Sequence, residues 1–106
     1  MKLLTEKLRA EFRRVGSQME SDNPMVVCKF FTPDSNWTWY AFDFEAVSRM
    51  FYGYVVGLEK EYGYFSLDEL SEARGPAGLP IERDRFFIAK PMSEILKGQR
   101  DERMSG

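Results

Sequence analysis

Residues 50–58, MFYGYVVGL, decide how the chain is expected to fold. Aromatic and β-branched residues suit the pleated, half-buried surface of a sheet, so this stretch is predicted to be a strand. Because side chains alternate along a strand, Phe51 and Val55 should point to one face of the sheet. Tyr52 and Tyr54 should point to the other face. Both faces are then largely apolar, so either helices cover both sides or an aromatic face is left for a partner.

Two further strands are predicted on the N-terminal side of this stretch. Residues 25–32, MVVCKFFT, are rich in β-branched and aromatic residues, and residues 37–42 repeat the two-faced pattern. Residues 33–36, PDSN, have the composition of a turn, so the two strands should form a hairpin. We expect the second strand to end near Asp43, with residues 44–49 as a short irregular or helical connection.

Turn-forming residues divide the chain after the central strand. Residues 59–63 are predicted to be a turn. Residues 74–80, RGPAGLP, combine glycines and prolines in a way that neither a helix nor a sheet accommodates, which predicts a rigid loop. Residues 85–90, RFFIAK, are a candidate fourth strand.

Three helices complete the prediction. Apolar residues recur at steps of four, four and three over residues 4–15, which indicates one amphipathic helix that Gly16 ends. A short second helix over residues 66–73 begins with a capping box, a serine followed three residues later by a glutamate. A third helix is predicted over residues 91–98, with the proline in its first turn.

These elements predict one α+β domain over residues 1–98. It contains an N-terminal helix, an antiparallel meander of three or four strands and two short helices. Residues 99–106 are predicted to be a flexible tail. A length of 106 residues fits a single domain with a real core.

The composition excludes several classes of function. The chain has no histidine, which removes the commonest general base and the commonest metal ligand together. No recognised catalytic motif is present, so we expect a protein without catalytic activity, metal or cofactor. No apolar run approaches the length that spans a bilayer, and the N-terminal residues do not form a signal peptide. We therefore expect a cytoplasmic protein that does not bind membranes.

Charges and aromatic side chains are unevenly distributed. Residues 1–15 carry five basic and two acidic side chains, whereas residues 16–72 carry three basic and ten acidic ones. Thirteen of the sixteen aromatic residues lie in residues 30–65, within the acidic stretch. A protein that binds nucleic acid by neutralising phosphates needs lysine and arginine beside its aromatic residues, and here these are scarce.

Three segments of the chain resemble a bacterial family known as domain of unknown function 2958. They are residues 29–40 (KFFTPDSNWTWY), residues 51–70 (FYGYVVGLEKEYGYFSLDEL) and residues 74–84 (RGPAGLPIERD). Such long strings are far more specific than a short motif. The resemblance implies an accessory gene of plasmids, phages or integrative elements, and proteins of that kind often bind and regulate a host macromolecule.

Four aromatic residues are candidates for a binding surface, namely Trp37, Trp39, Tyr52 and Tyr54. Tyrosine and tryptophan offer large rigid contact areas with one polar group, which suits binding hot spots. The alternative is that all four belong to an aromatic-rich core. The spacing of Tyr52 and Tyr54 also resembles the base-stacking strand of an RNA recognition motif, but the basic residue and the glycine that precede the first aromatic there are absent.

Charged residues form a second group of candidates. A negative surface aimed at a basic host protein would draw on the acidic residues Asp43, Glu45, Glu59, Glu61, Asp68, Glu69 and Glu72. The alternative is an ordinary solvated face. Arg74 and Arg83 flank the glycine-proline loop, where they either take part in recognition or bridge to a carboxylate that holds the loop. Cys28 is expected to be a buried, inert thiol.

Two functions follow from these observations. The first is a small non-catalytic interaction protein of a mobile genetic element that binds a host protein, for which a counter-defence inhibitor of the anti-CRISPR or anti-restriction type is one model. The second is a single-stranded nucleic-acid-binding module that uses the same sheet aromatics. In the second case Lys29, Arg49 and the basic N-terminal helix would neutralise phosphates.

Overall fold

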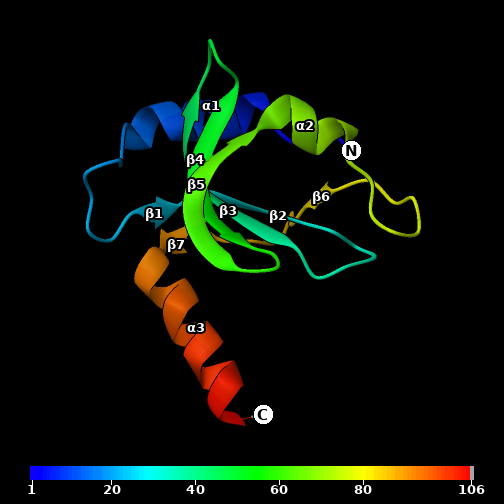
Figure 1. Ribbon diagram of the computed structural model, residues 1–106. Coiled ribbons are helices and arrows are strands. Elements are labelled where there is room, and N and C mark those ends of the chain that lie inside the picture. Colours follow the sequence, from blue (N-terminus) through cyan, green and yellow to red (C-terminus); the bar gives the residue numbers. More distant parts are fainter. Residues whose placement is uncertain (106) are drawn as a thin grey trace.

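The centre of the protein is a five-stranded antiparallel sheet (Figure 1). The computed structural model describes the backbone of residues 1–105 and the side chains of residues 1–99. The strand order is β5-β4-β3-β2-β6, so β5 and β6 are the two edges. The strands are β2 (Cys28–Phe31), β3 (Thr38–Glu45), β4 (Met50–Val56), β5 (Lys60–Ser66) and β6 (Glu82–Arg83).

Two helices cover one face of the sheet (Figure 1). Helix α1 (Glu6–Val15) begins where the Thr5 hydroxyl accepts the Leu8 N–H at 3.2 Å, and it ends at Gly16, whose φ is +75°. Helix α2 (Leu67–Glu72) begins where the Ser66 hydroxyl accepts the backbone N–H of Glu69 at 3.1 Å. Each hydroxyl satisfies an amide that the first turn of a helix leaves unpaired. The predicted starts and ends of both helices agree with the structure to within two residues.

The larger core lies between these helices and the sheet. Phe30 and Phe51 are completely buried there, with their ring centroids 5.3 Å apart. Phe12 of α1 packs on Phe51 at 5.9 Å, and Leu67 and Leu70 of α2 join the same cluster. Each helix therefore contributes its apolar side to one continuous core.

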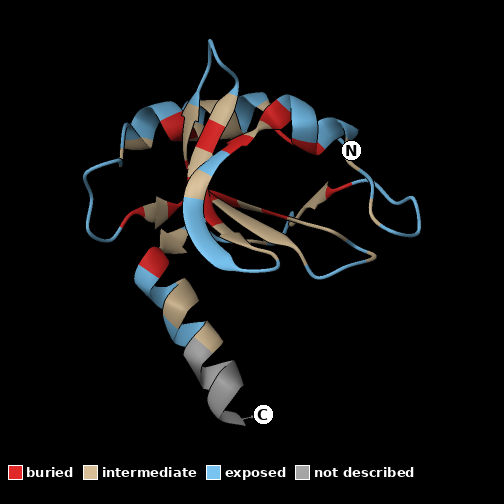
Figure 2. Ribbon diagram, in the orientation of Figure 1, coloured by how far each residue is buried: buried red, intermediate tan, exposed pale blue. Residues whose placement is uncertain are grey.

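The opposite face carries a smaller core. A two-stranded sheet of β1 (Met25–Val26) and β7 (Lys90–Pro91) leads into helix α3 (Met92–Ser105), which extends away from the sheet (Figure 1). Buried Met92 packs with Val26, Phe42 and Tyr54. Phe87, Ile95 and Leu96 pack against the same cluster and extend its cover of the second face, whereas Figure 2 shows much of the outer strand β5 exposed.

The sheet has five strands where the sequence predicts three or four, and β5 is a strand that the sequence does not predict. The predicted turn over residues 59–63 is wrong: strand β5 starts at Lys60, and the chain reverses just before it, where the Gly57 N–H donates to the Glu59 carbonyl at 2.9 Å. Charged residues and a glycine here resemble a turn in composition. In the structure residues 60–63 form the first part of an edge strand in which Lys60, Glu61 and Tyr62 are exposed, and such strands accept charge readily.

A β-bulge makes β3 longer than predicted. The register with β4 shifts between Ala41 and Asp43, so Phe42 is an extra residue and the alternation of faces is reversed after it. Phe44 consequently packs against Phe12 on the α1 side, with ring centroids 6.2 Å apart. The predicted connection over residues 44–49 is therefore wrong at its start, since β3 continues to Glu45.

The remaining differences concern the outer elements. The predicted first strand is divided into β1 and β2 at Val27. Residues 85–90 do not form the predicted fourth strand; Glu82 and Arg83 pair with β2 instead. Helix α3 continues to Ser105, beyond its predicted end at Gly98. The flexibility of residues 99–106 stays a prediction, and Gly106 lies outside the described residues.

Neither a membrane-spanning helix nor a cluster of metal ligands is found among the described residues. No described helix combines the length and the apolar character needed to cross a bilayer. Within the same part of the chain, no three or more cysteine, aspartate or glutamate side chains gather in a way that would hold a metal ion.

Candidate functional site

A groove between the sheet, α2 and the glycine-proline loop brings together four of the predicted binding residues. These are Trp37, Trp39, Glu69 and Arg74, and the groove also includes Pro76 and Ile81. Its volume is about 390 Å³. We call it the tryptophan groove.

The two tryptophans form a stacked pair along one wall of the groove. Their ring centroids are 5.8 Å apart and the ring planes are inclined by 27°. Trp37 lies over Gly57, where a Cβ atom would come within 2.3 Å of the indole ring. Trp39 packs against the larger core. Both side chains are half-buried, so part of each ring is accessible to a ligand while the buried part is held by packing against the protein.

The glycine-proline loop forms the opposite wall and is held in place by Asp34. One carboxylate oxygen of Asp34 accepts the N–H of Ala77 at 2.7 Å and that of Leu79 at 3.3 Å. Within the loop, the Gly75 N–H donates to the Leu79 carbonyl at 2.9 Å. Gly78 has a φ of +83°, a conformation that favours glycine. The loop is therefore built as a fixed element, as its composition predicts.

The two predicted loop arginines bind carbonyl groups and not carboxylates. The Arg74 guanidinium donates to the carbonyls of Glu72 at 3.1 Å and Ala73 at 2.8 Å, at the end of α2. The Arg83 guanidinium donates to the Lys2 carbonyl and, at 2.9 Å, to that of Leu3. The alternative in which Arg74 or Arg83 bridges to a carboxylate is therefore not found among the described side chains. Arg74 still lines the tryptophan groove, whereas Arg83 fastens the N-terminal segment.

The predicted acidic residues divide between two elements. Asp68, Glu69 and Glu72 are exposed on α2, and only Glu69 lines the groove. Asp68 accepts the Arg49 guanidinium at 2.9 Å, which neutralises part of this surface. Glu59 and Glu61 are exposed on the hairpin between β4 and β5.

All five tyrosines of the chain lie on the opposite face of the sheet. Tyr54 is only 6% exposed, so the prediction that it belongs to an exposed aromatic patch is wrong. Tyr52 is half-buried on the same face. The exposed rings are Tyr62 and Tyr64 on the edge strand, at 50% and 65%. Neither is predicted as a site residue, because Tyr62 falls in the predicted turn over residues 59–63 and no strand is predicted at Tyr64, although Tyr62-Gly63-Tyr64 repeats the pattern of Tyr52-Gly53-Tyr54.

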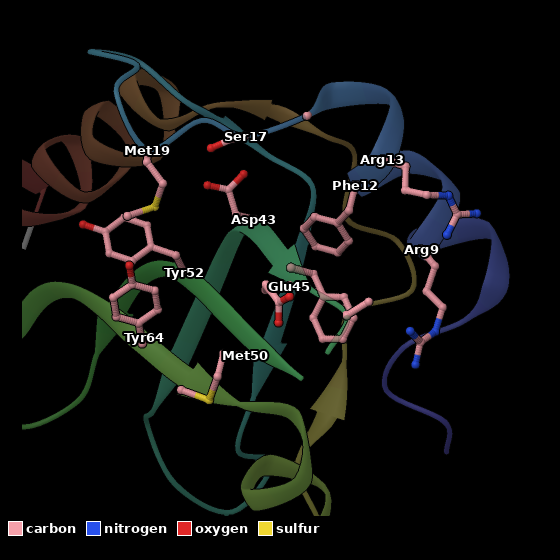
Figure 3. Close-up of a pocket in the computed structure, with 13 residues that line it drawn as sticks. Arg9, Phe12, Arg13, Ser17, Met19, Asp43, Glu45, Met50, Tyr52 and Tyr64 are labelled. Carbon is pink, nitrogen blue, oxygen red and sulfur yellow. The ribbon is translucent and has the colours of Figure 1, made fainter. Parts of the chain in front are cut away.

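A second cavity, of about 440 Å³, lies where the end of α1 and the following linker approach the ends of β3 and β5. Its lining includes Phe12, Met19, Asp43, Tyr52 and Tyr64 (Figure 3). We call it the Asp43 cavity. Burial raises the pKa of Asp43 above its usual value, against the opposing effect of the backbone N–H of Gln18. This cavity is not predicted from the sequence, because it depends on the bulge in β3.

The three segments on which the family resemblance rests meet at the tryptophan groove. Residues 29–40 supply the tryptophans, residues 51–70 supply the start of α2, and residues 74–84 supply the loop. A family model described as a protein of unknown function (DUF2958) matches residues 2–104. No curated protein and no solved structure matches the chain. The family match therefore spans the sheet, the groove and the cavity, α1, α2 and α3 as far as residue 104.

Proposed function

The chain belongs to the DUF2958 family, and from this premise we propose that it is a small non-catalytic interaction protein that binds a host protein through the tryptophan groove. The observation that carries the proposal is the convergence of Trp37, Trp39 and the fixed loop on one accessible groove. Stacked, half-buried tryptophans lose little conformational freedom on binding, which is why such residues dominate binding energy at interfaces.

The groove is also prepared for a partner by its rigidity. Asp34 fixes the loop, Gly57 supports Trp37, and Arg74 is held at the end of α2. A binding surface that is already ordered avoids the entropy cost of ordering it in the complex. The exposed acids of α2 beside the groove favour a partner with a basic surface.

The biological setting belongs to the same proposal. We propose that the protein is encoded by a mobile genetic element and acts in the cytoplasm of the host. Occupying the surface of a host nuclease or another defence protein would make it a counter-defence inhibitor of the anti-CRISPR or anti-restriction type. This role needs contact and no chemistry, which suits a chain without histidine.

Capture from host lysate, followed by mass spectrometry, tests the proposal with two variants. Trp37→Ala removes a groove residue, whereas Val47→Ser removes a side chain that is 91% exposed in the turn between β3 and β4. We expect Val47→Ser to retain the partner of the unmodified protein. Trp37→Ala should weaken binding of the purified partner by roughly 30-fold, the loss typical of a hot-spot residue. Equal binding by Trp37→Ala would contradict the proposal.

The nucleic-acid alternative is less well supported by the charges. Lys29 lies 4.0 Å from the Asp84 carboxylate, and Arg49 is paired with Asp68. Both cations thus have acidic neighbours that weaken their attraction for phosphate. A salt titration with a single-stranded oligonucleotide separates the two functions, because phosphate-driven binding weakens steeply as salt rises. We expect no binding at low salt, and salt-sensitive binding would favour the alternative.

A further inference from the structure

The Asp43 cavity places one fixed carboxylate among aromatic side chains. Figure 3 shows Asp43 between Tyr52 and Phe12, with Met19 and Tyr64 on the same side as Tyr52. Tyr52 and Tyr64 touch edge to face, with ring centroids 5.0 Å apart and planes inclined by 61°. The volume of about 440 Å³ falls in the range of ligand-binding pockets. The cavity is separate from the tryptophan groove and shares no lining residue with it.

The position of the carboxylate is set by the linker that follows α1. The backbone N–H of Gln18 donates to both oxygens of Asp43, at 2.9 and 3.1 Å. The Gln18 side chain in turn donates to the carbonyls of Met25 at 2.8 Å and Phe42 at 3.0 Å, and it accepts the Met25 N–H at 2.6 Å. Hydrogen bonds therefore hold Gln18 through both its backbone and its side chain. The lone pairs of Asp43 that Gln18 does not use can accept hydrogen bonds from a ligand in the cavity.

Asp43 has no cationic partner among the residues whose side chains are described. No lysine or arginine of residues 1–99 lies within ion-pair distance of it. The two arginines on the lining extend from α1 beyond Phe12 (Figure 3). Arg9 pairs with Glu6 at 3.7 Å and lies over the Phe44 ring at 5.2 Å. A half-buried carboxylate without a cation is a costly arrangement that a cationic ligand would relieve.

The other carboxylate on the cavity lining, Glu45, is already engaged. Glu45 accepts the backbone N–H and the hydroxyl of Ser48 in the turn after β3. The neighbouring rings favour a cation as well, because the faces of tyrosine and phenylalanine attract positive charge. The carboxylate, the rings and the apolar methionine together match a positive head group on an aliphatic chain.

We propose that the Asp43 cavity binds an alkylammonium group, whose charge pairs with the Asp43 carboxylate and whose alkyl chain packs on Tyr52 and Tyr64. This inference does not depend on the proposed function of the tryptophan groove. The ammonium group has two natural sources, a free aliphatic amine or the side chain of a lysine in a partner protein. A lysine side chain and a free butylamine present the same chemistry to the cavity.

Titration of the full-length chain with n-butylammonium chloride, followed by nuclear magnetic resonance, tests the proposal. We expect the signals of Gln18, Asp43 and Tyr52 to shift, and 1-butanol, which has the same shape without charge, to bind at least about tenfold more weakly. Asp43→Asn should bind n-butylammonium more weakly by a similar factor. Asp22→Asn changes an exposed acid in the linker and should bind n-butylammonium like the unmodified chain. Equal binding of the amine and the alcohol would overturn the proposal.

A second measurement needs no variant and does not depend on how Asp43→Asn folds. A bound ammonium stabilises the charged carboxylate, so saturating n-butylammonium should lower the pKa of Asp43 in the unmodified chain. The charged groups around Asp43 are Arg9 and Arg13 of α1 and Glu45 of β3, and they are the same with and without the amine. An unchanged pKa of Asp43 would overturn the proposal.

A short peptide distinguishes the two sources of the ammonium group. If the cavity serves a partner protein, acetyl-Gly-Lys-Gly-amide should bind more tightly than n-butylammonium, because its backbone adds contacts at the rim. Tighter binding of the free amine would assign the cavity to a small molecule. Failure of both probes would overturn the proposal and leave the tryptophan groove unaffected.

Discussion

Gly75 passes so close to Asp34 that a Cβ atom at position 75 would lie 1.7 Å from a carboxylate oxygen. That oxygen, Oδ1, is buried and has no hydrogen-bond partner, while the other carboxylate oxygen holds the amides of Ala77 and Leu79. The first and third family-like segments are thus joined through one side chain and one glycine. The geometry of the tryptophan groove depends on this contact.

Gly75→Ala is expected to displace the Asp34 side chain and release the loop. Losing the two hydrogen bonds should reduce the free energy of unfolding by about 1–3 kcal/mol. Hydrogen exchange checks the cause directly, because the amides of Ala77 and Leu79 should exchange faster. Gly98→Ala, where nothing lies within 4 Å of the added carbon, serves as the control. Unchanged protection of both amides in Gly75→Ala would show that the contact does not hold the loop.

Gly53 and Gly63 face each other across β4 and β5 but should respond oppositely to alanine. At Gly53 the added carbon would lie 1.9 Å from the Tyr40 carbonyl oxygen, which belongs to the backbone of β3 and has little freedom to move. Gly53→Ala should cost at least about 3 kcal/mol of stability. At Gly63 nothing lies within 4 Å. Gly63→Ala should be neutral or stabilise by up to about 1 kcal/mol. Urea unfolding measures both, and similar changes in stability would contradict the close approach of Gly53 to the β3 backbone.

The Cys28 thiol should be unreactive in the folded chain. Burial raises its pKa to about 12, so almost none of it is the reactive thiolate at neutral pH. We expect a thiol reagent to modify Cys28 only after unfolding, at a rate that follows the fraction of unfolded protein. The chain in denaturant provides the control. Rapid modification of the native protein would mean that β2 opens far more readily than its packing indicates.

Asp43 should make stability depend on pH in a direction unusual for an aspartate. Because burial raises its pKa in the folded state above 3.8, the folded chain holds this proton more tightly than the unfolded chain. The contribution of Asp43 to stability should therefore fall as the pH rises from 3.8 through the raised pKa. Unfolding of the unmodified chain and of Asp43→Asn across this window measures the difference. If the free energy of unfolding of the unmodified chain instead rises with pH relative to that of Asp43→Asn, the pKa of Asp43 is not raised in the folded chain.

The sequence predicts those elements whose signals are local. Over residues 4–15 the apolar spacing indicates α1, and Gly16 ends it. Ser66 caps α2, and residues 33–36 form the turn that connects β2 to β3, as their composition indicates. In each case the signal lies within the predicted element or within a few residues of its end. The DUF2958 resemblance is likewise confirmed, because it rests on long continuous strings.

Features that depend on distant partners are not predictable in the same way. Strand β5 needs β4 beside it, and the bulge at Phe42 becomes visible only in the pairing of two strands. Trp37, Trp39 and Arg74 are candidates from the sequence that the structure brings together in one groove, yet the carbonyl partners of Arg74 have no signature in the sequence. The Asp43 cavity joins side chains from α1, the linker and three strands, so no single stretch of sequence reveals it.

The stacked pair in the groove also gives the protein a built-in optical reporter. Trp37 and Trp39 are the only two tryptophans in the chain, and they touch each other. Indole emission from this molecule therefore comes entirely from one small region of its surface. A change in its colour or intensity when another molecule is added would locate the encounter without any label.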